Sequence, residues 1–136
     1  MKKTTDITYK LNAATSAEQL AAVFNASGIR RPTEDLPRLQ RMIDHADLTL
    51  TAWEDEKLIG VARAITDYSY CCYLSDLAVD KDYQKSGIGR KLVRLLQEQL
   101  GDEVTLLLLA SPTAMEYYPK IGFETIDNGF KILRKR

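Results

Sequence analysis

The run Val79-Asp80-Lys81-Asp82-Tyr83-Gln84-Lys85-Ser86-Gly87-Ile88-Gly89-Arg90-Lys91-Leu92 decides the fold of this chain. An apolar segment with β propensity ends at Val79, and an amphipathic helix is predicted from Gly87 to about Leu100. The two glycines lie at this junction, where backbone amides can face an anion without obstruction by side chains. The helix dipole adds partial positive charge there. The run therefore predicts a phosphate-binding loop between a strand and a helix.

Composition limits the class of protein. The chain has 136 residues, which fits one domain over residues 1–136. Lys+Arg and Asp+Glu both number 19, so no strong overall positive field attracts nucleic acid, and we expect no nucleic-acid partner. No apolar run reaches the ~18 residues of a membrane span, so we expect no membrane partner. The first six residues have no apolar core behind their lysines, which is not typical of a signal peptide, and we expect a cytoplasmic protein.

Cysteine and histidine are scarce. Cys71 and Cys72 are adjacent on a predicted strand, where neighbouring side chains point to opposite faces. His45 is the single histidine. The sequence therefore predicts neither a disulfide framework nor a metal site.

Upstream of the loop, hydrophobic periodicity predicts two helices and four strands. The first helix begins at a capping box, either Thr15 with Glu18 or Ser16 with Gln19, and ends at Gly28. The other elements expected here are a strand at residues 7–11, a helix at about 35–45, a hairpin of strands 48–53 and 57–65, and a strand at 70–79.

Downstream of the helix, residues 104–110 are nearly all aliphatic, as expected of a strand covered on both faces, such as a central parallel strand. Ser111 followed by Pro112 predicts the start of a helix that ends near Gly122. Segments 123–126 and 130–133 flank an Asn-Gly turn and predict a final hairpin. The order of elements indicates an α/β fold, a mixed sheet with helices on it.

Two separate stretches carry a resemblance to a known family. Residues 77–89 end in Gln84-Lys85-Ser86-Gly87-Ile88-Gly89, similar to a pyrophosphate-binding Gln/Arg-x-x-Gly-x-Gly/Ala segment. Residues 114–123, Ala-Met-Glu-Tyr-Tyr-Pro-Lys-Ile-Gly-Phe, are similar to an Ala-x-x-aromatic-Tyr-x-x-x-Gly-Phe pattern. On these residues the chain resembles the GCN5-related N-acetyltransferase (GNAT) superfamily over essentially its full length. The alternative for the glycines alone is a simple strand-to-helix connector.

The resemblance implies the GNAT fold, an α/β (α+β) architecture with a mixed central sheet of about six to seven strands, splayed at the cofactor site and flanked by about four helices. It also implies transfer of the acetyl group of acetyl-CoA to a primary amine of a small molecule or peptide, by direct attack in a ternary complex and without a metal. A non-catalytic acyl-CoA-binding module with the same fold is the alternative. A homodimer is compatible with the resemblance, because dimers are common among similar proteins.

The resemblance also implies the roles of particular residues. Amides around residues 85–90 hold the pyrophosphate, residues 77–79 bond the pantetheine arm, and Tyr118 gives a proton to the departing CoA sulfur. Ser111 stands where many members have asparagine, and its shorter reach leaves the exact pantetheine contact open. The implied cofactor-binding residues are Leu77, Ala78, Val79, Gln84, Lys85, Ser86, Gly87, Ile88, Gly89, Arg90, Ser111, Ala114 and Tyr118.

Other candidate residues have two interpretations each. Asp76 is the nearest sequence candidate for the catalytic base, with Glu54 a distant second, but a structural Asp76 or a water base fits as well. Tyr117 is interpreted as a packing residue. Arg30 and Arg31 could bind an acidic group on the acceptor or could form a solvated basic loop, and the second interpretation is favoured.

Overall fold

The computed structural model describes residues 6–136 and shows a mixed sheet with strand order β1-β2-β3-β4-β5. The charged start of the chain, residues 1–5, lies outside the described residues. The α/β class is confirmed, and so is the expectation of about four helices. The strands are β1 (Ile7–Leu11), β2 (Leu48–Glu54), β3 (Lys57–Thr66), β4 (Cys71–Val79) and β5 (Thr105–Leu107), and the helices are α1 (Ala17–Ser27), α2 (Leu36–Asp44), α3 (Ile88–Leu100) and α4 (Tyr117–Lys120).

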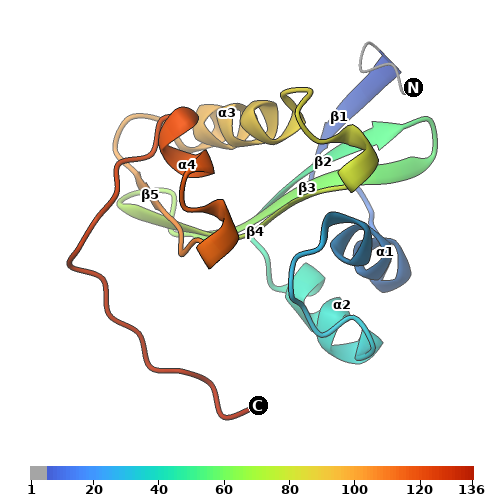
Figure 1. Cartoon of the computed structure of the whole chain (residues 1–136), viewed down its shortest axis with the longest axis horizontal. Coiled ribbons are helices and arrows are strands. Elements are labelled where there is room, and N and C mark those ends of the chain that lie inside the picture. The colour runs from blue at the N-terminus through green and yellow to red at the C-terminus, as the bar shows by residue number, and fades with distance from the viewer. Residues whose placement is uncertain (1–5) are drawn as a thin grey trace.

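Helices cover both faces of the sheet, with α3 on one face and α1 and α2 on the other (Figure 1). Strands β1 to β4 are antiparallel, and β5 pairs with β4 in parallel. On the α3 face, Leu92 and Leu96 are fully buried. On the other face, Phe24 of α1 packs in a second cluster with Trp53 and Val61. Of the helices described, none is long and apolar enough to span a membrane.

Local sequence explains where the helices begin and end. Of the two predicted capping boxes, the structure forms the one in which Ser16 accepts from the Gln19 amide at 3.0 Å and Gln19 accepts from the Ser16 amide at 2.9 Å. Gly28 ends α1 in the left-handed region, at φ 85°. Gly87 adopts a similar backbone, at φ 84°, immediately before α3, so the chain can turn sharply from the loop into the helix.

A bulge in β4 reverses the faces of its side chains. Asp76 pairs with Arg63 and Leu74 pairs with Ala64, which leaves Ser75 as the extra residue. Leu74 and Leu77 are three positions apart, so in a regular strand their side chains would lie on opposite faces. Because of the bulge, both lie on the α3 side of the sheet. The bulge lies where the cofactor site is expected.

Strands β4 and β5 part soon after they meet. Their register joins Cys71, Cys72 and Tyr73 to Thr105, Leu106 and Leu107, and no further pair follows in the described chain. Beyond Tyr73, β4 continues to Val79 with no strand on its β5 side. This confirms the expected splay of the sheet.

The last third of the chain differs from expectation. Residues 104–110 form only the three-residue β5 at the sheet edge, and residues 111–122 form a 3₁₀ turn (Pro112–Ala114) and the short α4 in place of one helix. The predicted hairpin of residues 123–133 is wrong, because this segment runs away from the sheet without forming strands (Figure 1). Phe130 and Ile132 are 95% and 100% exposed. A hairpin alone is marginal in water, and the short β5 offers it few partners, so the described sheet has five strands, fewer than the six to seven expected.

Replacing Leu92 with alanine should destabilise the protein by about 2–5 kcal/mol, because its fully buried side chain joins α3 to the sheet. Urea unfolding followed by circular dichroism measures this. The matched control is Leu133→Ala in the exposed final segment, where the change should stay within about 0.5 kcal/mol. Equal losses in the two variants would contradict this assignment of core and surface.

Candidate active site

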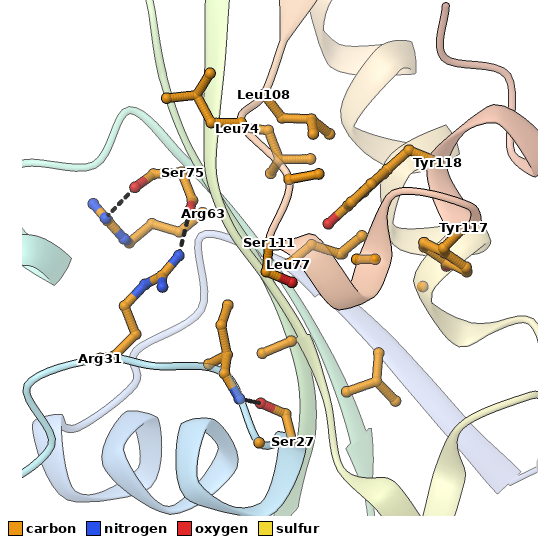
Figure 2. A pocket seen from close by; sticks show the side chains of 18 of the residues that line it. Ser27, Arg31, Arg63, Leu74, Ser75, Leu77, Leu108, Ser111, Tyr117 and Tyr118 are labelled. Atoms are coloured by element: carbon orange, nitrogen blue, oxygen red, sulfur yellow. Dashed lines mark hydrogen bonds between the residues drawn. The ribbon is translucent and has the colours of Figure 1, made fainter. Parts of the chain in front are cut away.

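The parting of β4 and β5 opens a cleft of about 1130 Å³. This volume slightly exceeds the ~300–1,000 Å³ typical of small-molecule sites, so the cleft can hold more than one small ligand. Its walls come from β4, from residues 108–111 after β5, from α4 and from the start of α3. The loop between α1 and α2 closes the remaining side, and Figure 2 shows side chains from these elements converging.

The structure brings together most of the residues that the sequence predicts for cofactor binding. Every member of that set lines the cleft except Ser86. The Ser86 hydroxyl instead donates a hydrogen bond to the carbonyl of Tyr83, which shapes the loop. Their placement is a structural fact, and their binding role stays a prediction.

One end of the cleft has the features of a phosphate site. Helix α3 begins without a side-chain cap, so its first amides have no side-chain partner among the described residues. Lys85 and Arg90 line this end. A Cβ atom at Gly89 would lie 2.5 Å from the Tyr117 hydroxyl, so only glycine fits there without movement. Tyr117 is thus a cleft residue as well as a packing residue.

The loop at this end is anchored to the sheet. The Gln84 side-chain amide donates to the Val79 carbonyl at 2.8 Å. The buried Tyr83 donates its hydroxyl to the Glu54 carboxylate at 2.5 Å, and this hydrogen bond raises the pKa of Tyr83 to about 12. Lys57 pairs with Asp80 at 3.6 Å. Glu54 therefore anchors the loop through Tyr83 and does not line the cleft.

The Tyr118 side chain extends from α4 into the middle of the cleft, and its hydroxyl points toward Leu77 and Ser111 (Figure 2). Edge-to-face contacts with Tyr117 and Phe123, at centroid distances of 5.2 and 5.6 Å, fix the ring. Burial raises the pKa of the phenol above its usual value of 10.0, with Tyr117 adding to the increase and Arg31 opposing it. The phenol therefore keeps its proton at neutral pH and can donate it.

Asp76 lies beneath the cleft floor and does not line it. Its side chain is 0% exposed, and its two oxygens accept from Arg31 Nε and Arg63 Nε, both at 2.5 Å. Arg31 also donates to the Ser75 carbonyl and Arg63 to the Ser75 hydroxyl, as Figure 2 shows. A carboxylate held in this way cannot reach an amine in the cleft, so the geometry supports the structural alternative for Asp76.

Sequence reasoning missed several residues of the cleft. Arg38 of α2, Arg63 and Tyr73 line it, and no motif indicates them. Arg63 carries the one available signal, because it is the single charge in the otherwise apolar run of residues 58–65 and such a charge is buried only with a partner. Among the described residues that line the cleft, none is Asp, Glu or His.

Comparison with known proteins identifies this arrangement. Residues 12–132 match the family model described as an Acetyltransferase (GNAT) domain. The fold is thus that of an acetyltransferase domain. More particularly, the chain belongs to the GNAT family of acetyltransferases.

Curated relatives agree with this assignment. GCN5-related N-acetyltransferase 2, chloroplastic, from Arabidopsis thaliana and Histone acetyltransferase TAP1 from Glycine max are each 37% identical over 83 residues, or 57% of this chain. These matches cover 31% and 35% of the two relatives, so the chain corresponds to about a third of their length. The uncharacterized N-acetyltransferase ycf52 of Gracilaria tenuistipitata is 31% identical over 109 residues, 76% of this chain and 58% of that protein.

Solved structures share the fold. A GNAT family acetyltransferase from Streptococcus pneumoniae TIGR4 has a TM-score of 0.75 at 20% identity, covering 96% of this chain and 99% of the other. An aminoglycoside N-acetyltransferase in complex with CoA has a TM-score of 0.70 at 15% identity, covering 96% and 95%. At these identities the likeness extends to the fold alone.

Replacing Asp76 with asparagine should cost about 3 kcal/mol or more of unfolding free energy, because it leaves two guanidinium groups without their buried partner. Urea unfolding measures this, with the exposed Asp102→Asn as the matched control. A stable Asp76→Asn protein that binds its ligands normally but has lost turnover would instead make Asp76 the base.

Proposed function

We propose that this protein is an N-acetyltransferase that transfers the acetyl group of acetyl-CoA to the primary amine of a small molecule or peptide by direct attack in a ternary complex. One observation carries the proposal. The Tyr118 hydroxyl and the unpaired edge of β4 at Leu77 face the same cleft, one end of which is the uncapped start of α3. A single domain, a cytoplasmic location and a homodimer remain predictions.

The residues present fit acetyl-CoA. The start of α3, with Lys85 and Arg90, offers amides and cations for a pyrophosphate. Past Tyr73, the β5-facing backbone groups of β4 have no strand partner in the described chain, so they can bond a pantetheine arm. When bound, acetyl-CoA supplies an activated acetyl group on a thiol leaving group. A backbone amide at Leu77 would stabilise negative charge on the acetyl oxygen.

Two protons must move in this reaction. The new bond joins the amine nitrogen to the acetyl carbon, and the bond from that carbon to sulfur breaks. Tyr118 gives its proton to the leaving thiolate, for which its raised pKa keeps the proton available. The attacking neutral amine loses one proton to water as it becomes an amide, because the described cleft lining holds no carboxylate or imidazole, and the Tyr118 phenolate regains one proton from water.

That missing base also favours a second candidate, a non-catalytic module that binds acyl-CoA. The two functions are separated by following thiol release with acetyl-CoA and a panel of amines. Because Cys71 is an exposed thiol, formation of the acetylated amine should be followed in parallel by mass spectrometry. Strong thermal stabilisation by acetyl-CoA with no product on any amine would select the binding module.

Tyr118→Phe should lower kcat by about 100-fold, because it removes the proton donor and leaves the ring packing intact. The affinity for acetyl-CoA should change little. Steady-state kinetics measures both, and Tyr70→Phe, at a side chain that is 77% exposed, is the matched control. An unchanged kcat in Tyr118→Phe would remove the role assigned to this phenol.

Gly89→Glu should weaken CoA binding by about tenfold or more, because it places bulk against Tyr117 and negative charge at the start of α3. Isothermal titration with CoA measures the affinity. Gln97→Glu introduces the same charge at an exposed position of α3 and should leave it unchanged. Equal affinities in the two variants would place the pyrophosphate elsewhere.

A further inference from the structure

On the side formed by the loop after α1, by α2 and by β3, the described residues that line the cleft include four arginines and no Asp or Glu. Arg30 and Arg31 come from the loop after α1, Arg38 from α2 and Arg63 from β3. We name these four residues the arginine wall. Within residues 6–136, the one carboxylate that pairs with members of the wall is Asp76, which is buried beneath it and neutralises only part of its charge.

The four arginines divide into two kinds. Arg31 and Arg63 donate hydrogen bonds to Asp76, to Ser75 and to the backbone carbonyls of two other residues, so their side chains are fixed in place. The side chains of Arg30 and Arg38 make no hydrogen bond or ion pair with residues 6–136. Two guanidinium groups with unused donors therefore face the cleft beside a fixed pair that still carries surplus positive charge.

The phosphate end of the cleft does not explain these charges. The wall meets β4 at Ser75, whereas the loop that leads to α3 is tied to β4 at Val79. Four residues of extended strand separate the two points by about 13 Å. An anion bound at Lys85 and Arg90 thus lies toward the other end of this stretch of β4, which leaves the wall free to bind a negative group of its own.

We infer that the acceptor is a small amine that also carries a carboxylate, an amino acid, and that the wall binds this carboxylate while the amine lies at Leu77. The inference rests on the proposed function and names its substrate class. Ser75 and Leu77 are two residues apart on β4, about 7 Å, so one amino acid can reach both points. Guanidinium groups bind carboxylates through paired hydrogen bonds, which gives Arg30 and Arg38 their role.

The same wall rejects cationic acceptors. A polyamine or an aminoglycoside would bring several positive charges against four guanidinium groups, without a carboxylate among the described residues of the cleft lining to offset them. The aminoglycoside N-acetyltransferase that shares the fold therefore gives no guide to the acceptor here.

Matched pairs of acceptors test the inference. Phenylalanine is compared with phenethylamine, and lysine with cadaverine, so that each pair differs by one carboxylate. The carboxylate-bearing member should have a kcat/KM at least about tenfold higher, because it alone pairs with the wall. An equal or higher value for the decarboxylated amines, or acetylation of an acidic peptide in preference to the amino acids, would overturn the inference.

Variants locate the effect. Arg38→Gln should raise KM for the amino acid about tenfold and leave KM for acetyl-CoA unchanged, whereas KM for the decarboxylated amine should not rise, because that amine has no carboxylate to lose a contact. Arg38→Lys should recover part of the loss. Arg41→Gln, the same change on the same helix at an exposed arginine outside the cleft, is the matched control. Equal effects of Arg38→Gln and Arg41→Gln would contradict the role of the wall.

A binding measurement separates this inference from the proposed function. If no amine is acetylated, the proposed function fails. Titrating phenylalanine and phenethylamine into the CoA-loaded protein by calorimetry then decides the inference alone. Preferential binding of phenylalanine that is lost in Arg38→Gln supports it, and the absence of any preference overturns it.

Discussion

The buried Asp76 carboxylate is the interaction on which the cleft depends. Its two bonds join β4 to β3 through Arg63 and to the loop after α1 through Arg31. A buried charge without partners would cost several kcal/mol, so all three segments must stay together for the fold to persist. The bulge at Ser75 belongs to the same unit, since its carbonyl and hydroxyl accept from the same two arginines. The contacts that form the floor of the cleft are therefore the same contacts that hold β3, β4 and the loop after α1 together.

A second anchor fixes the far end of the cleft. The Tyr83 hydroxyl and the Glu54 carboxylate join the loop before α3 to the end of β2, and Gln84 joins it to the end of β4. Between the two anchors, β4 has no neighbour on its β5 side in the described chain. The open backbone edge is thus held by side chains at both of its ends, which lets the sheet part there without losing its register.

The sequence predicted well those features that depend on near neighbours. The capping of α1 by Ser16 and Gln19 and the glycine at the start of α3 involve residues a few positions apart. The prediction of a final hairpin is wrong because an Asn-Gly turn is a local signal, whereas the strands of a hairpin also need the edge of a sheet to pair with. That edge, β5, offers only three residues. The sequence does not predict the burial and ion pairing of Asp76 for the same reason, since its partners Arg63 and Arg31 lie 13 and 45 positions away. The arginine wall comes from three elements that share no pattern, whereas Tyr118 and the glycine loop were found through a family resemblance.

The lack of Asp and Glu among the described residues that line the cleft bears on the chemistry as well as on the proposed specificity. An alkyl ammonium has a pKa near ~10.4 and must lose a proton before it can attack. Nearby guanidinium groups disfavour its charged form and so lower that pKa, whereas a carboxylate in the same place would raise it. The arginine wall can thus hold the carboxylate of an acceptor and, in the same position, promote the neutral amine at the other end of the molecule. Under the substrate selection that we infer, the cleft has less need of a catalytic base, which agrees with a site in which Asp76 is buried and Glu54 is engaged elsewhere.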